Sequence, residues 1–175
     1  FEVYNTPFYI YDFNELLEKE GLSHVVDSYL QKSFPFLPNE ILDKIENDCQ
    51  NDYIWKEQYY DYLTDCQFRS SIITHKDNIK DINISRNIKI DSIKALNYRG
   101  FYLKNEEGKY VIGEDKEVVE DEKKALFLET VAKHYPNTVT VEDLEKELEN
   151  KLTTVEICEI ILVLIYQRKI EVYND

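Results

Sequence analysis

The sequence predicts an α+β fold, in which a helix-rich N-terminal part with a small antiparallel sheet precedes a segment of three helices. In several stretches apolar side chains recur three and four residues apart, which is typical of amphipathic helices; Tyr59, Tyr62 and Leu63 are one example. The stretch Phe68–His75 changes to a period of two, which indicates a strand. Further along, a four-residue connection that ends on Gly108 predicts a hairpin between two extended stretches.

The first helix is predicted over Thr6–Glu20, with Thr6 as its N-cap and Pro7 at the first helical position, where a preset φ is favourable. Gly21 is expected to end this helix as a C-cap. The expected buried stripe of the helix consists of Phe13, Leu16 and Leu17. A strand is expected to follow over Ser23–Leu30.

Two further helices are predicted in this part of the chain. The first has Asn39 as its cap, follows a loop in which two prolines prevent regular pairing, and ends at Cys49. The second covers about Asp52–Asp65. The expected inner faces are Ile41, Leu42 and Ile45 in the first helix, and Trp55, Tyr59, Tyr62 and Leu63 in the second. For the aromatic residues we expect a role in the core, with ligand stacking as the alternative.

The middle of the chain is expected to consist of short extended pieces. Residues 76–89 are predicted to form edge strands or an irregular crossing. The highly charged stretch 113–121 is interpreted as the linker between two domains, 1–118 and 119–175, or as the frayed start of the next helix.

Three helices and a closing strand are predicted after this stretch. The first helix is expected to end before Pro136, and the second to begin with a pair similar to a capping box, Thr140 and Asp143. Thr153 or Thr154 is expected to cap the third helix. The expected ranges are 122–135, 141–150 and 155–166 for the helices and 169–173 for the strand. This order resembles a winged-helix domain, although the return strand of the wing is absent.

The charge of the chain argues against nucleic acid as a partner. The chain carries 35 acidic and 21 basic residues, a formal net charge of −14, and residues 120–175 carry 13 acidic and 7 basic residues. To read DNA, the third helix of the winged-helix-like segment would need cations on its exposed face, but it offers Glu156 and Glu159 there. An acidic surface suits a basic, lysine-bearing protein substrate, or it merely keeps the chain in solution.

Cysteine usage and hydropathy predict a cytoplasmic protein. The three cysteines are odd in number and widely spaced, which favours reduced thiols over disulfides and metal ligands. No signal peptide is visible, and the longest apolar run, Ile157–Tyr166, is interrupted by Glu159 and is too short to cross a membrane. Because the sequence contains no Met at all, we expect it to be a fragment of a longer protein.

Two blocks of residues carry a family resemblance. The pattern E-Q-x-x-D-[FY]-L, four residues and F-R-x-[ST]-[LI] is present as Glu57, Gln58, Asp61, Tyr62, Leu63, Phe68, Arg69, Ser71 and Ile72. The pattern N-x-P-[FY]-Y-[FI]-x-[DE]-F is present as Asn5, Pro7, Phe8, Tyr9, Ile10, Asp12 and Phe13, and a Gly-Leu pair follows it. Together the blocks resemble the regulatory domain that follows the catalytic domain in a group of bacterial S-adenosylmethionine-dependent methyltransferases, some of which are protein-lysine methyltransferases.

The resemblance covers about the first hundred residues and includes two departures. The four residues before Phe68 are usually basic but are TDCQ here, and the Tyr and Glu that the family has after Gly-Leu appear as His24 and Asp27. The resemblance implies that residues 1–118 are a non-catalytic regulatory domain. It also implies that S-adenosylmethionine binds to a catalytic domain absent from this chain, which would be the partner of this chain in cis.

No catalytic, cofactor-binding or metal site is predicted from motifs. The chain has four glycines and no G-x-G-x-x-G, so it lacks the turn with which dinucleotide-type folds hold a nucleotide. Cys66 and His75 form a conceivable nucleophile pair, on which a hydrolase alternative rests. His24 is interpreted as a surface or satisfied core histidine rather than as a ligand.

A polar cluster is expected where the helix that ends near residue 65 leads into the next strand. Its candidate members are Asp12, Glu57, Tyr59, Asp61, Arg69 and His75. Arg69 can make a two-pronged contact with a carboxylate, and this contact is either a structural tie or part of a substrate site. Tyr9, Tyr11 and Tyr59 are candidates for a pocket that accepts a methylammonium or lysine side chain.

The leading hypothesis is that the chain is the substrate-recognition and regulatory portion of a methyltransferase, without its catalytic domain. A stand-alone protein-interaction scaffold is the alternative, and a hydrolase is the third possibility.

Overall fold

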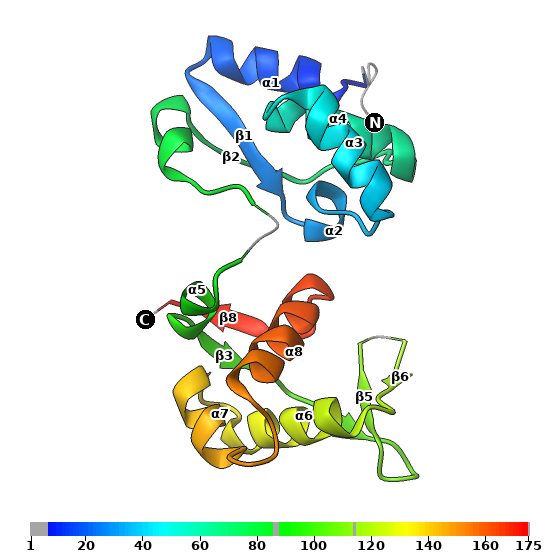
Figure 1. Cartoon of the computed structure of the whole chain (residues 1–175), viewed down its shortest axis with the longest axis vertical. Helices are drawn as coiled ribbons and strands as arrows, with labels where there is room; N and C mark the ends of the chain where they lie inside the picture. Colours follow the sequence, from blue (N-terminus) through cyan, green and yellow to red (C-terminus); the bar gives the residue numbers. More distant parts are fainter. Residues whose placement is uncertain (1–6, 86–87, 114, 175) are drawn as a thin grey trace, which may run out of the picture. The chain divides into compact units, whose positions relative to one another are not determined.

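The computed structural model describes residues 7–85, 88–113 and 115–174, and the chain forms two compact units, Phe1–Arg86 (unit 1) and Asn87–Asp175 (unit 2) (Figure 1). Both units combine helices with small antiparallel sheets. The predicted α+β fold class is therefore confirmed.

Unit 1 packs its helices around α4. Its elements are α1 (Ile10–Lys19), β1 (Leu22–Asp27), α2 (Leu30–Ser33), α3 (Asn39–Cys49), α4 (Tyr53–Thr64), β2 (Ser71–His75) and the 3-10 helix η1 (Lys76–Asp81). β1 and β2 are antiparallel, with Leu22 opposite His75 and Asp27 opposite Ser71. α4 packs against α1, α2 and α3, and α1 and α2 also pack against β1, so α4 is the element that connects the others.

α1 begins later than the sequence predicts. Thr6, the expected N-cap, and Asn5 of the family pattern lie outside the described residues. Tyr9 takes the N-cap position, in an extended conformation and without a side-chain hydrogen bond to the helix. The start of α1 is instead satisfied from α4, because Gln58 Oε1 accepts a hydrogen bond from the backbone N–H of Tyr11 at 3.3 Å. This contact gives the Gln of the family pattern a structural role.

The buried faces of the helices differ from the predicted ones. α4 buries Ile54, Glu57, Gln58 and Tyr60. Trp55, Tyr59, Tyr62 and Leu63, which were predicted to face inward, are instead 41–59% exposed. On α1, Ile10 and Asn14 are buried, but Leu16 is 42% exposed. On α3, Ile45 is buried, but Ile41 is 37% exposed. The apolar periodicity is misleading here because several inward positions carry polar groups with hydrogen-bond partners inside the unit.

Three further stretches of unit 1 differ from their predictions. The strand predicted over 23–30 ends at Asp27, and the short helix α2 follows it. Residues 76–81 form η1 rather than an edge strand, which was one of the two predicted alternatives. Asn39 is the first residue of α3 rather than its cap, because Pro38 takes the N-cap position.

Unit 2 contains two three-stranded sheets and four helices among its described residues. Its elements are α5 (Ile90–Lys94), β3 (Asn97–Arg99), β4 (Leu103–Lys104), β5 (Tyr110–Ile112), β6 (Glu117–Val118), α6 (Glu122–His134), β7 (Val139–Thr140), α7 (Val141–Glu147), α8 (Thr154–Tyr166) and β8 (Glu171–Tyr173). β3 lies between β7 and β8, and β5 lies between β4 and β6. α8 packs against α5, α6 and α7, and α6 packs against β3.

The predicted hairpin is present as β4 and β5, with Leu103 opposite Val111 and Gly108 at a φ of +80°. In its described residues, the stretch 113–121 is folded into a sheet rather than forming a linker or a frayed helix start. It contains β6, whose Val118 lies opposite Val111, so this charged stretch adds the third strand to the hairpin.

Unit 2 also includes residues 88–118, which the sequence assigns to the first of its two predicted domains. The reason lies in β3, because Asn97 is opposite both Thr140 of β7 and Tyr173 of β8. The fully buried Tyr98 shares one apolar core with the C-terminal helices. The compact units therefore divide after residue 86 and not at the predicted boundary between residues 118 and 119.

The three C-terminal helices and the closing strand are present in the predicted order. Thr140 accepts a hydrogen bond from the Asp143 N–H at 3.1 Å, and Thr153 forms a capping box with Glu156. The third strand of their sheet is β3, which precedes the helices, rather than the return strand of a wing. The winged-helix assignment of this segment stays a prediction.

Candidate functional site

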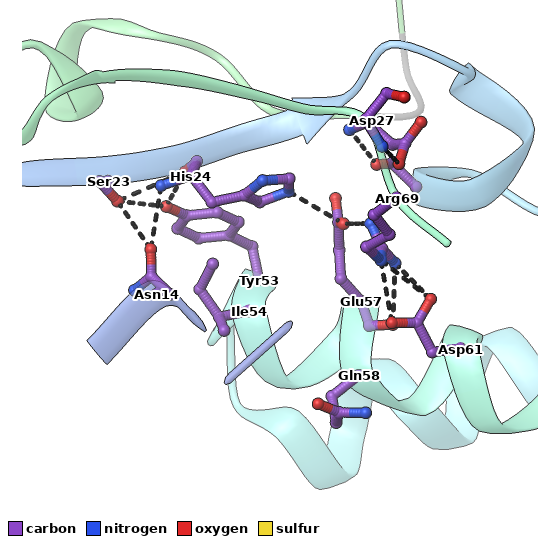
Figure 2. A network of polar contacts seen from close by, with 12 residues as sticks. Asn14, Ser23, His24, Asp27, Tyr53, Ile54, Glu57, Gln58, Asp61 and Arg69 are labelled. Carbon is purple, nitrogen blue, oxygen red and sulfur yellow. Dashed lines mark hydrogen bonds and ion pairs between the residues drawn. The ribbon is translucent and has the colours of Figure 1, made fainter. Parts of the chain in front are cut away.

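The expected polar cluster is built around Arg69, which lies in the loop between α4 and β2 (Figure 2). Its Nε lies 2.9 Å from both carboxylate oxygens of Asp61, and its Nη2 lies 2.7 Å from Asp61 Oδ1. Its Nη1 forms an ion pair with Glu57 Oε2, and its Nη2 donates to the Glu57 carbonyl at 3.2 Å. The three side chains are only 4–13% exposed. All three guanidinium nitrogens are therefore used within the fold.

The two carboxylates converge on Arg69 because they lie four residues apart on one face of α4. Burial opposes the charge of Arg69, but hydrogen bonds to Asp61 and the charge of Glu57 outweigh it and raise the pKa of the guanidinium. A guanidinium that stays charged cannot exchange protons with a substrate. The arrangement is thus suited to holding the helix–strand corner rather than to acid–base chemistry.

The carboxylate of Glu57 has a second partner, His24 of β1. His24 Nε2 lies 3.0 Å from Glu57 Oε2, and its side chain is fully buried. The backbone N–H of His24 donates to Asn14 Oδ1 at 2.9 Å, and the Tyr53 hydroxyl donates to the His24 carbonyl at 2.5 Å. Burial raises the pKa of Tyr53, which keeps this hydroxyl protonated. Among the described residues, Nδ1 of His24 has no hydrogen-bond partner.

Asp27, at the end of β1, holds the loop that leads into β2. Its Oδ2 accepts from the Ser70 N–H and its Oδ1 from the Tyr29 N–H, each at 2.8 Å. The sequence-based prediction included neither Asp27 nor His24 in the cluster. His24 stands where the family pattern has a Tyr, and Asp27 where it has a Glu. Two polar residues within a predicted strand were the sequence signal that could have added them to the cluster.

The structure brings together three of the six predicted cluster residues: Glu57, Asp61 and Arg69. Asp12, Tyr59 and His75 are exposed, and in the described part of the chain no hydrogen bond or ion pair joins them to Arg69. Tyr59 follows Glu57 by two residues, about 200° around the helix, and so projects from the other face of α4. Asp12 lies in the first turn of α1, and His75 ends β2.

The suggested Cys66–His75 pair gains no support from the geometry. The thiol of Cys66 lies 3.3 Å from the Phe68 carbonyl, and burial raises the pKa of this thiol, whereas a nucleophilic cysteine needs a lowered pKa. Cys66 lies in the loop before β2, whereas His75 is the last residue of this strand. The four residues from Ser71 to His75 correspond to about 13 Å of extended strand.

The three tyrosines predicted to line one pocket have different neighbours. Tyr9 packs edge-on against Tyr62, with ring centroids 5.7 Å apart, and Tyr11 lies 4.5 Å from Trp55. Tyr59 lines an open hollow of about 560 Å³ together with Trp55. The exposed aromatic face of α4 is therefore a surface distinct from the buried Arg69 cluster.

The described residues show neither a metal-ion site nor a helix that could span a membrane. Within residues 7–85, 88–113 and 115–174, no group of three or more His, Cys, Asp or Glu residues is arranged to hold a metal ion. None of the described helices has the length and apolarity needed to span a bilayer.

The chain resembles other proteins over different lengths. An uncharacterized protein of Rickettsia prowazekii (strain Madrid E), RP789, is 29% identical over 94 residues, which are 53% of this chain and 16% of that protein. Two structures of PKMT2 from Rickettsia typhi, one of them in complex with AdoHcy, match 99% and 97% of this chain with a TM-score of 0.67 and 21% identity. The chain spans 36% of the length of each, and at this identity the likeness shows the fold alone.

The family model described as "Predicted methyltransferase regulatory domain" matches residues 1–75. The matched segment contains both blocks of the resemblance and the Arg69 cluster together with its partner His24. The resemblance inferred from the sequence is thereby confirmed for residues 1–75, which match the model of this family.

Proposed function

We propose that this chain is the substrate-recognition and regulatory part of an S-adenosylmethionine-dependent protein methyltransferase, and that it has no catalytic residues of its own. The observation that supports this most is that the family residues satisfy one another. Glu57, Asp61 and Arg69 are bonded together, and their side chains are at most 13% exposed. Reacting groups need an open face toward a substrate, whereas these groups hold a corner of the fold.

The architecture supports a cofactor site outside this chain. Every strand pair among the described residues is antiparallel. The dinucleotide-type fold needs parallel strands joined through a glycine-rich turn, and the chain has only four glycines. Since PKMT2 from Rickettsia typhi was solved with AdoHcy and this chain matches 36% of it, we assign S-adenosylmethionine to a catalytic domain in the remaining part of the same protein.

The partner that we propose is a basic protein, because the chain has a net charge of −14. Exposed charges act mainly on the association rate and are screened over roughly 8–10 Å at physiological salt. Binding of a lysine-rich substrate is therefore expected to weaken several-fold from low to physiological salt, and duplex DNA is expected to bind at neither. Binding of DNA would contradict the inference, drawn from the charge, that the chain does not bind nucleic acid.

The decisive experiment compares the full gene product with a variant from which these 175 residues are deleted. Methyl transfer from labelled S-adenosylmethionine to a lysine-bearing protein is expected to fall to background in the deletion, while cofactor binding persists. Retention of full protein methylation would overturn the role in substrate recognition. A gene product without a nucleotide-binding βαβ unit would favour the stand-alone scaffold instead.

Calorimetric titration of the isolated chain with S-adenosylmethionine tests the location of the cofactor site. We expect weak binding or none. A dissociation constant tighter than ~10 μM, about −7 kcal/mol, would mean that this chain holds the cofactor.

A further inference from the structure

An open hollow lies where α3 ends and α4 begins, outside the Arg69 cluster. Its volume is about 560 Å³, and it is lined by Asp48, Cys49, Gln50, Asp52, Trp55 and Tyr59. Trp55 and Tyr59 are one helical turn apart on α4, and each is 41% exposed. Two aromatic and two acidic residues thus border the same space.

The local backbone explains why these residues meet. Gln50 and Asn51 have left-handed conformations, with φ of 47° and 72°, so α3 ends abruptly and α4 starts at once. Asp52 caps α4 by accepting from the N–H groups of Ile54 and Trp55, at 3.0 and 3.1 Å. The last turn of α3 is therefore held beside the first turns of α4.

The carboxylates of the hollow keep unpaired oxygens. Both capping bonds of Asp52 use Oδ1, and no hydrogen bond or ion pair to Oδ2 exists among the described residues. Neither carboxylate oxygen of Asp48 has a hydrogen bond or an ion pair to another described residue. The lining of this hollow contains no basic side chain. A cation that enters it would meet negative charge without displacing an existing partner.

A second hollow shares Asp52 with the first. Tyr11 of α1 lies 4.5 Å from Trp55, and Tyr11 lines a hollow of about 290 Å³ together with Glu15, Glu18 and Asp52. Asp52 borders both hollows. The only basic side chain in either lining is that of Lys76, which is already paired with Glu18 at 2.6 Å. Acidic residues therefore outnumber basic ones in both linings.

We propose that the hollow at Trp55 and Tyr59 binds a lysine side chain, free or methylated, of a protein partner. Aromatic faces attract an ammonium group, most strongly at Trp, and nearby carboxylates add to the attraction. An acidic or purely apolar side chain would gain neither. The inference rests on the proposed function for the identity of the partner, since it assigns the surface at which a lysine-bearing substrate would bind.

The chain contains a single tryptophan, Trp55, so its fluorescence reports directly on the hollow. The probe is a short peptide of alternating lysine and serine, and the matched peptide has glutamine in place of lysine. We expect a saturable change in Trp55 emission with the lysine peptide and at least about tenfold weaker binding of the glutamine peptide. A peptide with trimethyllysine is expected to bind better than the same peptide in which a neutral carbon replaces the charged nitrogen of that side chain. Only the trimethyllysine peptide carries a positive charge at this position.

The variants Tyr59→Leu, Asp48→Asn and Asp52→Ser remove one recognition group each. Leu keeps the apolar bulk of the ring, and Ser keeps the N-cap of α4. Tyr59→Leu is expected to weaken the lysine peptide about two- to fivefold, the range for an exposed cation–π contact. Tyr62→Leu on α4 and Asp43→Asn on α3 lie outside the lining and serve as matched controls, with affinity expected to stay unchanged.

Equal binding of the lysine and glutamine peptides, or equal loss in the control and hollow variants, would overturn the proposal. Circular dichroism of each variant separates lost binding from lost folding. The result is independent of the methylation assay: if the full gene product methylates protein but the hollow binds no lysine, only the site is wrong. If the hollow binds lysine but no methyltransferase activity exists, only the proposed function is wrong.

Discussion

The two compact units have interiors of opposite character. Unit 2 buries nineteen apolar side chains in one contiguous cluster, and among its described residues a single polar residue, Thr130, is equally buried. The described residues of unit 1 bury only six apolar side chains, together with seven polar or charged ones. Six of those seven are joined by hydrogen bonds or ion pairs to β1, α4 or the loop before β2, as Figure 2 shows for the Glu57 region.

This difference explains where a recognisable motif lies. An apolar core tolerates swaps among residues of similar volume, so many sequences are compatible with unit 2. A buried polar network is stable only when each donor has its acceptor at the right distance, and it therefore requires particular residue types at particular spacings. The pattern that carries the family resemblance lies in unit 1, which is held together by such a network.

The largest effect is expected from breaking the network at Arg69. Arg69→Ala leaves the carboxylates of Glu57 and Asp61 buried without their cation, and is expected to destabilise unit 1 by about 3–5 kcal/mol. Arg69→Lys should restore only part of this, because an ammonium lacks the two-pronged geometry. Urea unfolding followed by Trp55 fluorescence measures both variants. A midpoint that is unchanged in Arg69→Ala would show that the side chain is not a structural tie.

The corresponding change in unit 2 is Leu144→Ala, which opens a cavity in a fully buried site and is expected to cost about 2–5 kcal/mol. The comparison is sharpened by the conservative change Leu144→Met, expected to cost less than about 1.5 kcal/mol. Amide exchange of α7 and α8 measures these losses. If Leu144→Met were as damaging as Leu144→Ala, the core of unit 2 would be as demanding of residue type as the network of unit 1.

A smaller effect is expected at Tyr98, whose hydroxyl donates to the Ile93 carbonyl at 2.7 Å inside the core of unit 2. Tyr98→Phe removes this bond and is expected to cost about 1 kcal/mol at neutral pH. Burial raises the pKa of Tyr98 to about 12, above the value of about 10 in an unfolded chain.

The direction of this shift determines the pH dependence. The stability contributed by the neutral phenol is fully present below about pH 10 and is lost as the pH rises toward about 12, because the unfolded chain releases the proton first. Urea unfolding followed by circular dichroism from about pH 9 to about pH 11 is expected to show a shallower decline in Tyr98→Phe than in the natural chain. Equal slopes would show that Tyr98 ionises as readily in the folded unit.

The smallest effect is expected on the aromatic face of α4. Tyr62→Ser removes a side chain that is 59% exposed, and the free energy of unfolding is expected to change by no more than about 0.5 kcal/mol. Thermal or urea unfolding checks this. A loss above about 2 kcal/mol would support the original prediction that Tyr62 faces the core.

Much of the local structure was predictable because local signals determine it. Thr140 and Thr153 cap the helices that they were expected to cap, and the Gly108 turn joins the expected strands. The pairing of Arg69 with Glu57 and Asp61 was also predictable, since the residues are close in sequence and complementary in charge. These features depend on neighbours within about a dozen residues.

The remaining features depend on partners that are distant in sequence. The inner face of α4 was misassigned because Glu57 and Gln58 are polar, and only partners on β1 and α1 make their burial favourable. His24 is a core histidine, one of the two interpretations that the sequence allowed, but its partner Glu57 could not be named because it is 33 residues away. The place of β3 between β7 and β8 has no local signal, since the pairing joins Arg99 to Glu171.

The position of β3 has a practical consequence for dissecting the chain. A fragment that begins at residue 119, where the sequence suggests a domain boundary, would contain β7 and β8 but not the strand that lies between them. Each would expose the hydrogen-bonding edge that β3 covers, and unpaired edges promote aggregation. A fragment cut between residues 85 and 88 keeps the sheet whole, so insolubility of the shorter piece would report a missing strand rather than an inability of the C-terminal helices to fold.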